Sequence, residues 1–182
     1  MNDLSMHIID IIQNSLRAGA TLITVTIEED REDDLLVITV EDNGCGMSSE
    51  QVAKLNDPFF TSRTTRRVGM GIPLLQQTAE QSGGELEIKS EPGIGTTVKA
   101  SFGYSHIDRP PLGDVANAFM LMVSANPEID FILRYVVGNA DYLFNTVEIK
   151  KVLEGIPVNE PSVIRALTEM IRENIEDLKK KK

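Results

Sequence analysis

The segment DNGCGM, residues 42–47, places a carboxylate beside two glycines directly after a predicted strand. Gly44 and Gly46 allow backbone angles that are closed to other residues, and they let a flat ring or a phosphate approach the main chain. Asp42 could then accept a hydrogen bond from an exocyclic amine at the bottom of such a pocket. The alternative is a type I′ hairpin turn, because Asn43-Gly44 is a strong turn signal, and the segment taken alone favours that turn.

Asp10 and Asn14 form a second polar pair, four residues apart in a stretch with helical apolar spacing. Residues at this spacing project from one face of a helix, so the two side chains could serve a common site. The helix is otherwise apolar on its inward side. The alternative is therefore that the pair marks the solvent edge of an amphipathic helix.

Gly69-Met70-Gly71 opens a further predicted helix. The free N–H groups and the dipole at a helix start favour a phosphate. The preceding loop is rich in threonine and arginine and offers donors for an anion. These donors are Thr61, Ser62, Arg63, Thr64, Thr65, Arg66 and Arg67. The alternative is a solvated surface loop.

Each of these patterns is weak alone, but their order along the chain is specific. The order is Asp10-x-x-x-Asn14, Asp42-x-Gly44-x-Gly46, Asp57-Pro58-Phe59-Phe60-Thr61, Gly69-x-Gly71 and Gly95-Thr96-Thr97. This set resembles the N, G1, F and G2 boxes of the GHKL (Bergerat-fold) ATPases and kinases. Residues 57–102 look most like histidine kinases, and residues 10–20 look more like mismatch-repair ATPases. The resemblance covers about the first 103 residues.

The resemblance implies a site for ATP with Mg²⁺. Asn14 would coordinate the metal, since a hard cation prefers oxygen ligands. Asp42 would hydrogen-bond the adenine amine with support from Thr96. The remaining implied nucleotide-binding residues are the pocket and phosphate-contacting residues Gly44, Gly46, Met47, Gly69, Met70, Gly71 and Ile72, and the lid residues Phe60, Thr61, Arg63, Arg66 and Arg67.

The lid would span residues 61–68, anchored by Phe59 and Phe60, although Phe60 could equally be plain core. One departure from the family concerns the start of the fold. The strand and helix that usually precede the N box are missing ahead of Asp10, so that layer must be short or supplied elsewhere.

Three functions are compatible with this resemblance. The first is a histidine-kinase-like domain that transfers phosphate to a separate protein partner, because neither His7 nor His106 begins the His-acidic pair of an acceptor helix. The second is a slow ATPase or ATP-dependent switch with Asp10 as general base, where hydrolysing relatives carry a glutamate. The third is an ATP sensor without chemistry.

The spacing of apolar residues along the chain predicts an α/β (α+β) two-layer sandwich, a mixed sheet backed by helices. Expected helices span 3–18, 70–82, 114–125, 147–154 and 161–178; expected strands span 21–28, 35–41, 85–90, 96–102, 129–137 and 141–146. An acidic turn is expected at 29–34 and a long loop at 54–69. Residues 1–103 would form the ATP domain, 104–113 a linker, and 114–182 a small α+β region, appended or continuous with the same core.

Composition narrows the class of protein. The net charge is −10, and residues 1–103 hold 8 basic and 16 acidic residues, which disfavours nucleic acid as a partner. No apolar run approaches the ~20 residues that cross a bilayer, so no membrane contact is expected. The single cysteine, Cys45, and the lack of a signal peptide predict a cytoplasmic protein. Homodimerisation stays open.

Overall fold

A computed structural model describes residues 3–55 and 71–180. One six-stranded sheet forms the centre of the molecule, in the order β3-β4-β2-β1-β5-β6. All neighbouring strands are antiparallel except β1 and β5, which are parallel. The strands are β1 (Leu22–Asp30), β2 (Leu35–Asp42), β3 (Leu86–Glu91), β4 (Gly95–Gly103), β5 (Asp130–Val137) and β6 (Ala140–Asn145).

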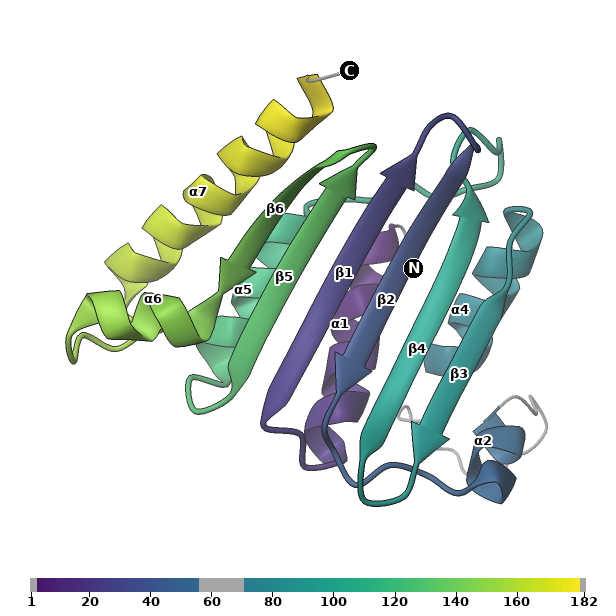
Figure 1. The fold of residues 1–182 in the computed structure, drawn as a ribbon, viewed down its shortest axis with the longest axis horizontal. Coiled ribbons are helices and arrows are strands. Elements are labelled where there is room, and N and C mark those ends of the chain that lie inside the picture. The colour runs from purple at the N-terminus through teal and green to yellow at the C-terminus, as the bar shows by residue number, and fades with distance from the viewer. Residues whose placement is uncertain (1–2, 56–70, 181–182) are drawn as a thin grey trace.

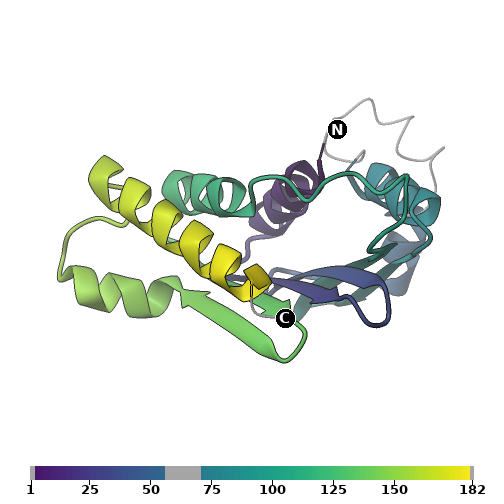
Figure 2. The same cartoon turned by 90° about the horizontal axis from the view of Figure 1, so that it is seen from above.

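Helices α1, α4 and α5 cover one face of the sheet, while the opposite face is open (Figures 1 and 2). The described helices are α1 (Leu4–Arg17), α2 (Ser49–Leu55), α4 (Gly71–Gln81), α5 (Val115–Ala125), α6 (Thr146–Leu153) and α7 (Pro161–Lys180). The predicted two-layer fold with a mixed sheet is therefore confirmed. No helix within residues 3–55 and 71–180 is both long and apolar enough to cross a membrane.

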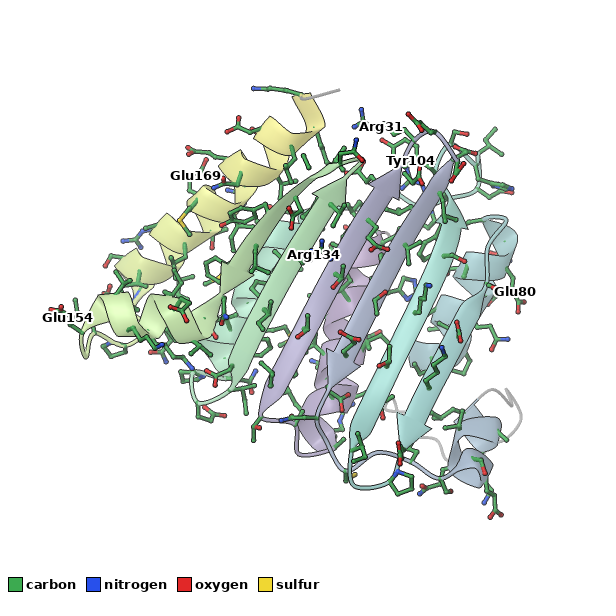
Figure 3. All side chains as sticks on the ribbon, in the orientation of Figure 1. Arg31, Glu80, Tyr104, Arg134, Glu154 and Glu169 are labelled. Carbon is green, nitrogen blue, oxygen red and sulfur yellow. The ribbon has the colours of Figure 1, made fainter. Side chains whose placement is uncertain are left out.

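Alternation along the strands explains the two layers. In β1, Ile23, Val25 and Ile27 are fully buried, and the residues between them are partly exposed on the open face. Figure 3 looks onto this open face, where Arg134 of β5 forms an ion pair of 3.2 Å with Asp141 of β6. Polar side chains on this open face are typical of an antiparallel sheet that faces water on one side.

Helix α1 begins at a capped end and buries one apolar stripe. The Asp3 side chain accepts a hydrogen bond from the N–H of Met6 (3.1 Å), which caps the helix start. The buried side chains then recur at intervals of three and four residues: Leu4, Ile8, Ile11, Ile12 and Ser15. The helix lies across the sheet, with its carboxyl end near the end of β2.

The chain after residue 103 supplies the neighbours of β1 and α1. Strand β5 pairs with β1, and α5 packs against α1 and contributes to the same apolar core. The connecting segment is fixed to the start of α1, because Leu4 donates to the carbonyl of Pro111 and Ser5 to that of Leu112, both at 2.9 Å. Residues after 103 therefore extend the same sheet and the same helical layer as β1 and α1.

Two local predictions are wrong. Glu29 and Asp30 belong to β1 rather than to the expected turn, since Glu29 is buried and accepts a hydrogen bond from Tyr135 (2.5 Å). The expected loop at 54–69 begins too early, because α2 continues to Leu55. A capping box starts α2: Ser48 and Gln51 each accept a hydrogen bond from the other's backbone N–H.

Candidate functional site

A cavity of about 270 Å³ opens between the carboxyl end of α1 and the adjoining ends of β2, β3 and β4. Its walls are mostly apolar, with a few polar groups that come from α1, β2 and β4. A flat apolar ring with polar edges suits such a lining. The lining residues are Ile11, Asn14, Ser15, Arg17, Ala18, Asp42, Cys45, Gly46, Met47, Leu55, Ile72, Ile88, Thr96 and Val98.

Asp42 is held firmly in this cavity by two donors. The Ser15 hydroxyl donates to Oδ2 at 2.6 Å, and the Gly44 N–H donates to Oδ1 at 2.9 Å. An ionised carboxylate offers about four acceptor positions, so both oxygens can still accept from a ligand. The cavity therefore contains a fixed hydrogen-bond acceptor with an apolar surround.

Strand register brings Thr96 opposite Asp42. The two residues are paired across β2 and β4. The Thr96 hydroxyl lies 2.7 Å from that of Ser90, and the Ser90 hydroxyl accepts from the N–H of Met47 at 2.8 Å. This chain of hydrogen bonds connects the loop after β2 to strands β3 and β4.

The loop after β2 approaches the sheet closely. Gly46 has φ +70°, and a Cβ at this position would lie 2.0 Å from the carbonyl oxygen of Glu91. Only glycine fits there. The hairpin alternative is wrong, because β2 is followed by α2 rather than by a paired strand. Asn43 instead fixes the loop to the start of β1, where its side chain accepts from the N–H groups of Thr21 and Leu22.

Asn14 faces the same cavity from α1. Its Oδ1 accepts a hydrogen bond from Arg17 Nη1 at 3.0 Å. The amide oxygen is the only Mg²⁺ ligand that the family resemblance assigns to the protein, and Mg²⁺ commonly keeps several waters and binds substrate phosphates. The donor chemistry fits such an ion, provided that Arg17 releases Oδ1. Within residues 3–55 and 71–180, no cluster of three or more His, Cys, Asp or Glu side chains could hold a metal.

Asp10 lies one turn before Asn14, beside the first residue of α4. A Cβ at Gly71 would be 3.3 Å from the Asp10 Cβ and 3.7 Å from its Oδ2. The Asp10 carboxyl accepts no hydrogen bond from the described residues. Burial raises the pKa of this carboxyl, and the nearby Arg17 opposes the shift. Asp10 is therefore near the start of α4 and outside the lining of the cavity.

Several predicted site residues fall outside the described part of the chain. They are Phe60, Thr61, Arg63, Arg66, Arg67, Gly69 and Met70, together with Phe59 and the rest of the predicted lid. The structure does bring together Asn14, Asp42, Gly46, Met47, Ile72 and Thr96 in one cavity lining.

Sequence reasoning missed four residues that shape the site. Ser15 interrupts the apolar stripe of α1 at a buried position, a pattern that could have identified it. Arg17 follows Asn14 by three residues and so shares its face. Asn43 and Ser90 were missed because they bond to residues far away in sequence: Asn43 to Thr21 and Leu22, and Ser90 to Met47.

Comparisons with known proteins agree with this fold and cavity. A family model for the histidine kinase-, DNA gyrase B- and HSP90-like ATPases matches residues 2–105. The chain belongs to this family, as the GHKL resemblance predicted, and it carries a histidine-kinase-like ATP-binding domain. The match covers the elements that line the cavity.

Two of the individual relatives are a bacterial sensor protein and a bacterial sensor histidine kinase. Sensor protein DegM of a Bacillus species is 33% identical over 100 residues, and sensor histidine kinase ZraS of Salmonella typhi is 30% identical over 93 residues. These alignments cover 55% and 50% of this chain, but only 26% and 20% of the relatives. The chain therefore spans a minor part of each relative's length.

Among solved structures, the Aquifex aeolicus MutL ATPase domain complexed with ADP has the same fold. The superposition covers 85% of this chain and 70% of that one, with a TM-score of 0.54 and 18% sequence identity. At this identity the likeness concerns the fold alone. It includes more of the chain than the family model, which matches residues 2–105.

Proposed function

We propose that this protein binds Mg·ATP in the cavity at the end of α1 and transfers phosphate to a separate protein. The observation that carries the proposal is the fixed carboxylate of Asp42. Its two oxygens are oriented by Ser15 and Gly44, and the cavity around it is lined mostly by apolar residues. An adenine amine is a donor that such an acceptor can bind.

The triphosphate would extend from the adenine toward Asn14, Arg17 and the start of α4. Arg17 supplies a guanidinium for phosphate oxygens. The amide of Asn14 would hold the metal ion, which neutralises charge on the phosphates. Helix α4 begins at Gly71, and the N–H groups of its first turn would bind phosphate oxygens. These assignments, like the predicted lid, are part of the proposal.

The positions of the two histidines favour phosphotransfer to a partner over autophosphorylation. His7 is 3% exposed within the packing of α1, so a phosphoryl donor has no access to it. His106 is exposed beside Gly83, at the far end of α4 from Gly71. A second protein would therefore have to present the acceptor, whether histidine, serine or threonine.

A slow ATPase or ATP-dependent switch is the second candidate, and the environment of Asp10 supports it. The carboxylate is beside the start of α4, and burial raises its pKa. A raised pKa makes the ionised form a stronger base once it is deprotonated. Hydrolysis by this route would fall as the pH drops through a value above the ordinary one of about 3.9 for aspartate. An ATP sensor without chemistry is the third candidate.

Labelled ATP distinguishes these functions. The protein is incubated with γ-labelled ATP and Mg²⁺, alone and with candidate partner proteins. Label on a partner supports the kinase, and free phosphate that falls by about 100-fold or more in Asp10→Asn supports general-base hydrolysis. ATP binding without either product, against every partner tested, would contradict phosphotransfer and leave the sensor.

A further inference from the structure

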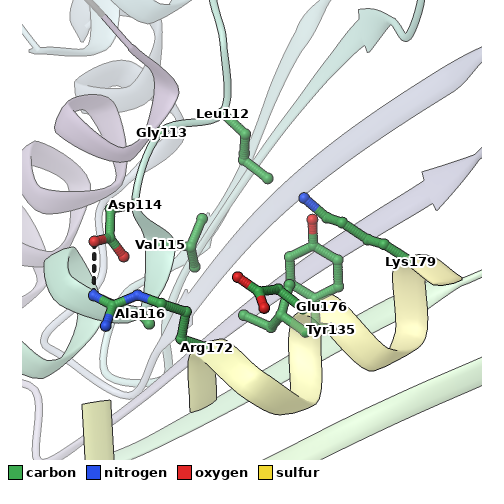
Figure 4. Close-up of a pocket in the computed structure, with 10 residues that line it drawn as sticks. Leu112, Gly113, Asp114, Val115, Ala116, Tyr135, Arg172, Glu176 and Lys179 are labelled. Carbon is green, nitrogen blue, oxygen red and sulfur yellow. Dashed lines mark hydrogen bonds and ion pairs between the residues drawn. The ribbon is translucent and has the colours of Figure 1, made fainter. Parts of the chain in front are cut away.

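A second cavity, of about 320 Å³, lies away from the nucleotide site (Figure 4). It is bounded by the segment from Leu112 to Ala116 and by one face of α7, with Tyr135 of β5 between them. Apolar contact surface comes from Leu112, Val115 and Ile175. The volume suits a small molecule rather than a protein segment.

Four charged side chains reach this cavity, and two of them neutralise each other. Arg172 Nη2 donates to Asp114 Oδ2 at 2.8 Å, and its other terminal nitrogen donates to Glu169 at 2.8 Å. The guanidinium is thus occupied by protein carboxylates. Figure 4 shows the Asp114–Arg172 pair at one side of the cavity.

The other two charges, Glu176 and Lys179, remain available to a ligand. They lie three residues apart on α7, so they share one face of the helix. Glu176 makes no hydrogen bond or ion pair with the described residues. The Lys179 ammonium has a distant ion pair with Glu29, at 4.0 Å, and lies 5.7 Å from the Tyr135 ring centroid. Glu176 and Lys179 do not form an ion pair with each other.

We propose that this cavity binds a free α-amino acid with an apolar side chain. The α-ammonium would pair with Glu176, the α-carboxylate with Lys179, and the side chain would contact Leu112, Val115 and Ile175. A phosphate would meet repulsion from Glu176, and a metal cation would meet repulsion from Lys179. A ligand with both charges and no net charge complements the cavity.

Titration calorimetry of the full chain tests the ligand class. The probes are the apolar amino acids together with two analogues of leucine: isopentylamine, which lacks the carboxylate, and 4-methylpentanoate, which lacks the ammonium. At least one amino acid should bind, and for leucine the loss of either charge should weaken binding about tenfold or more. Absence of binding by every amino acid, or equal binding of leucine and both analogues, would overturn the proposal.

Variants then locate the site. Glu176→Gln and Lys179→Met should each weaken amino-acid binding about tenfold, whereas Glu173→Gln, an exposed change on the same helix that does not line the cavity, should leave it unchanged. All three variants should bind ATP like the parent chain. A failure of the amino-acid proposal can therefore be distinguished from a failure of the proposed ATP binding. Unchanged amino-acid binding in the first two variants would contradict the assignment.

Discussion

Ser15 orients the Asp42 carboxylate that we propose binds the adenine amine. Its hydroxyl is buried on α1, in a stripe of isoleucine and leucine, and it donates to Asp42 at 2.6 Å. The carboxylate is thereby fixed before any nucleotide arrives. A fixed acceptor loses less freedom on binding than a mobile one.

Replacing this serine should therefore weaken nucleotide binding. Ser15→Ala removes one donor to Asp42, and we expect the Kd for ATP to rise about tenfold, as the net value of a hydrogen bond to a charged group implies. Calorimetry gives the Kd directly. Ser82→Ala is the matched control, since Ser82 is also a buried serine, directly after α4, but donates to the carbonyl of Thr78, away from the cavity. An unchanged Kd in Ser15→Ala would show that Asp42 needs no such support.

At the scale of elements, α1 and α4 meet around a buried histidine. His7 Nε2 lies 3.5 Å from the Thr78 hydroxyl, and that hydroxyl donates to the carbonyl of Leu74. The other ring nitrogen, Nδ1, is buried and has no hydrogen-bond partner in the described residues. Burial lowers the pKa of His7, because a charged ring would be desolvated there.

This histidine should make stability depend on pH. The unfolded chain takes up a proton near pH 6.5, while the folded one stays neutral to a lower pH. Stability contributed by the neutral ring is present above about pH 6.5 and is lost as the pH falls toward the folded pKa, with a slope of at most about 1.4 kcal/mol per pH unit. Denaturant unfolding between pH 5 and 7 measures this slope.

Two histidine variants isolate the effect. His7→Leu should flatten the dependence over this range, because the variant has no group to protonate at the α1–α4 contact. His106→Gln changes an exposed ring and should keep the parent slope. If the parent and His7→Leu lose stability in parallel, another group causes the dependence.

A buried pair also connects the two halves of the sheet. Tyr135 of β5 donates to Glu29 of β1 at 2.5 Å, and both side chains are almost fully buried. Arg31 and Lys179 approach the same carboxylate at 3.8 and 4.0 Å. Arg31 and Tyr104 lie together near this end of the sheet (Figure 3).

Loss of this hydroxyl should destabilise the fold. Tyr135→Phe leaves Glu29 buried without its shortest donor, and we expect a loss of about 1–3 kcal/mol in the free energy of unfolding. The comparison variant is Tyr142→Phe, whose hydroxyl makes no hydrogen bond with the described residues and whose removal should cost less than about 0.5 kcal/mol. Equal losses in urea titrations would contradict a special role for the Glu29–Tyr135 contact.

At the scale of the whole molecule, periodicity predicted most of the elements. The alternation in β1 and the apolar stripe of α1 gave the correct types because each element buries one face. Long-range pairing was beyond the sequence pattern. The parallel contact between β1 and β5 joins residues over 100 positions apart, and the burial of Glu29 depends on Tyr135, which is equally distant.

The candidate nucleotide site was predictable only in part. Asn14 and Asp42 belong to short motifs with fixed spacing, and both line the cavity. Ser90 bonds to Thr96 on the neighbouring strand and to the N–H of Met47, which is 43 residues away, so no local pattern marks it. The predicted phosphate-binding lid, residues 61–68, lies outside the residues that the structure describes, and its role stays a prediction.

The most direct test of the nucleotide site is calorimetric titration of the chain and its Asp42→Asn variant with Mg·ATP. We expect saturable binding by the parent chain and a loss of about 100-fold or more in the variant, since an amide nitrogen or a neutral oxygen replaces the charged acceptor. Asp33→Asn, an exposed aspartate in the turn after β1, should bind like the parent. Equal affinity of the parent and Asp42→Asn, or no binding by the parent, would contradict the account.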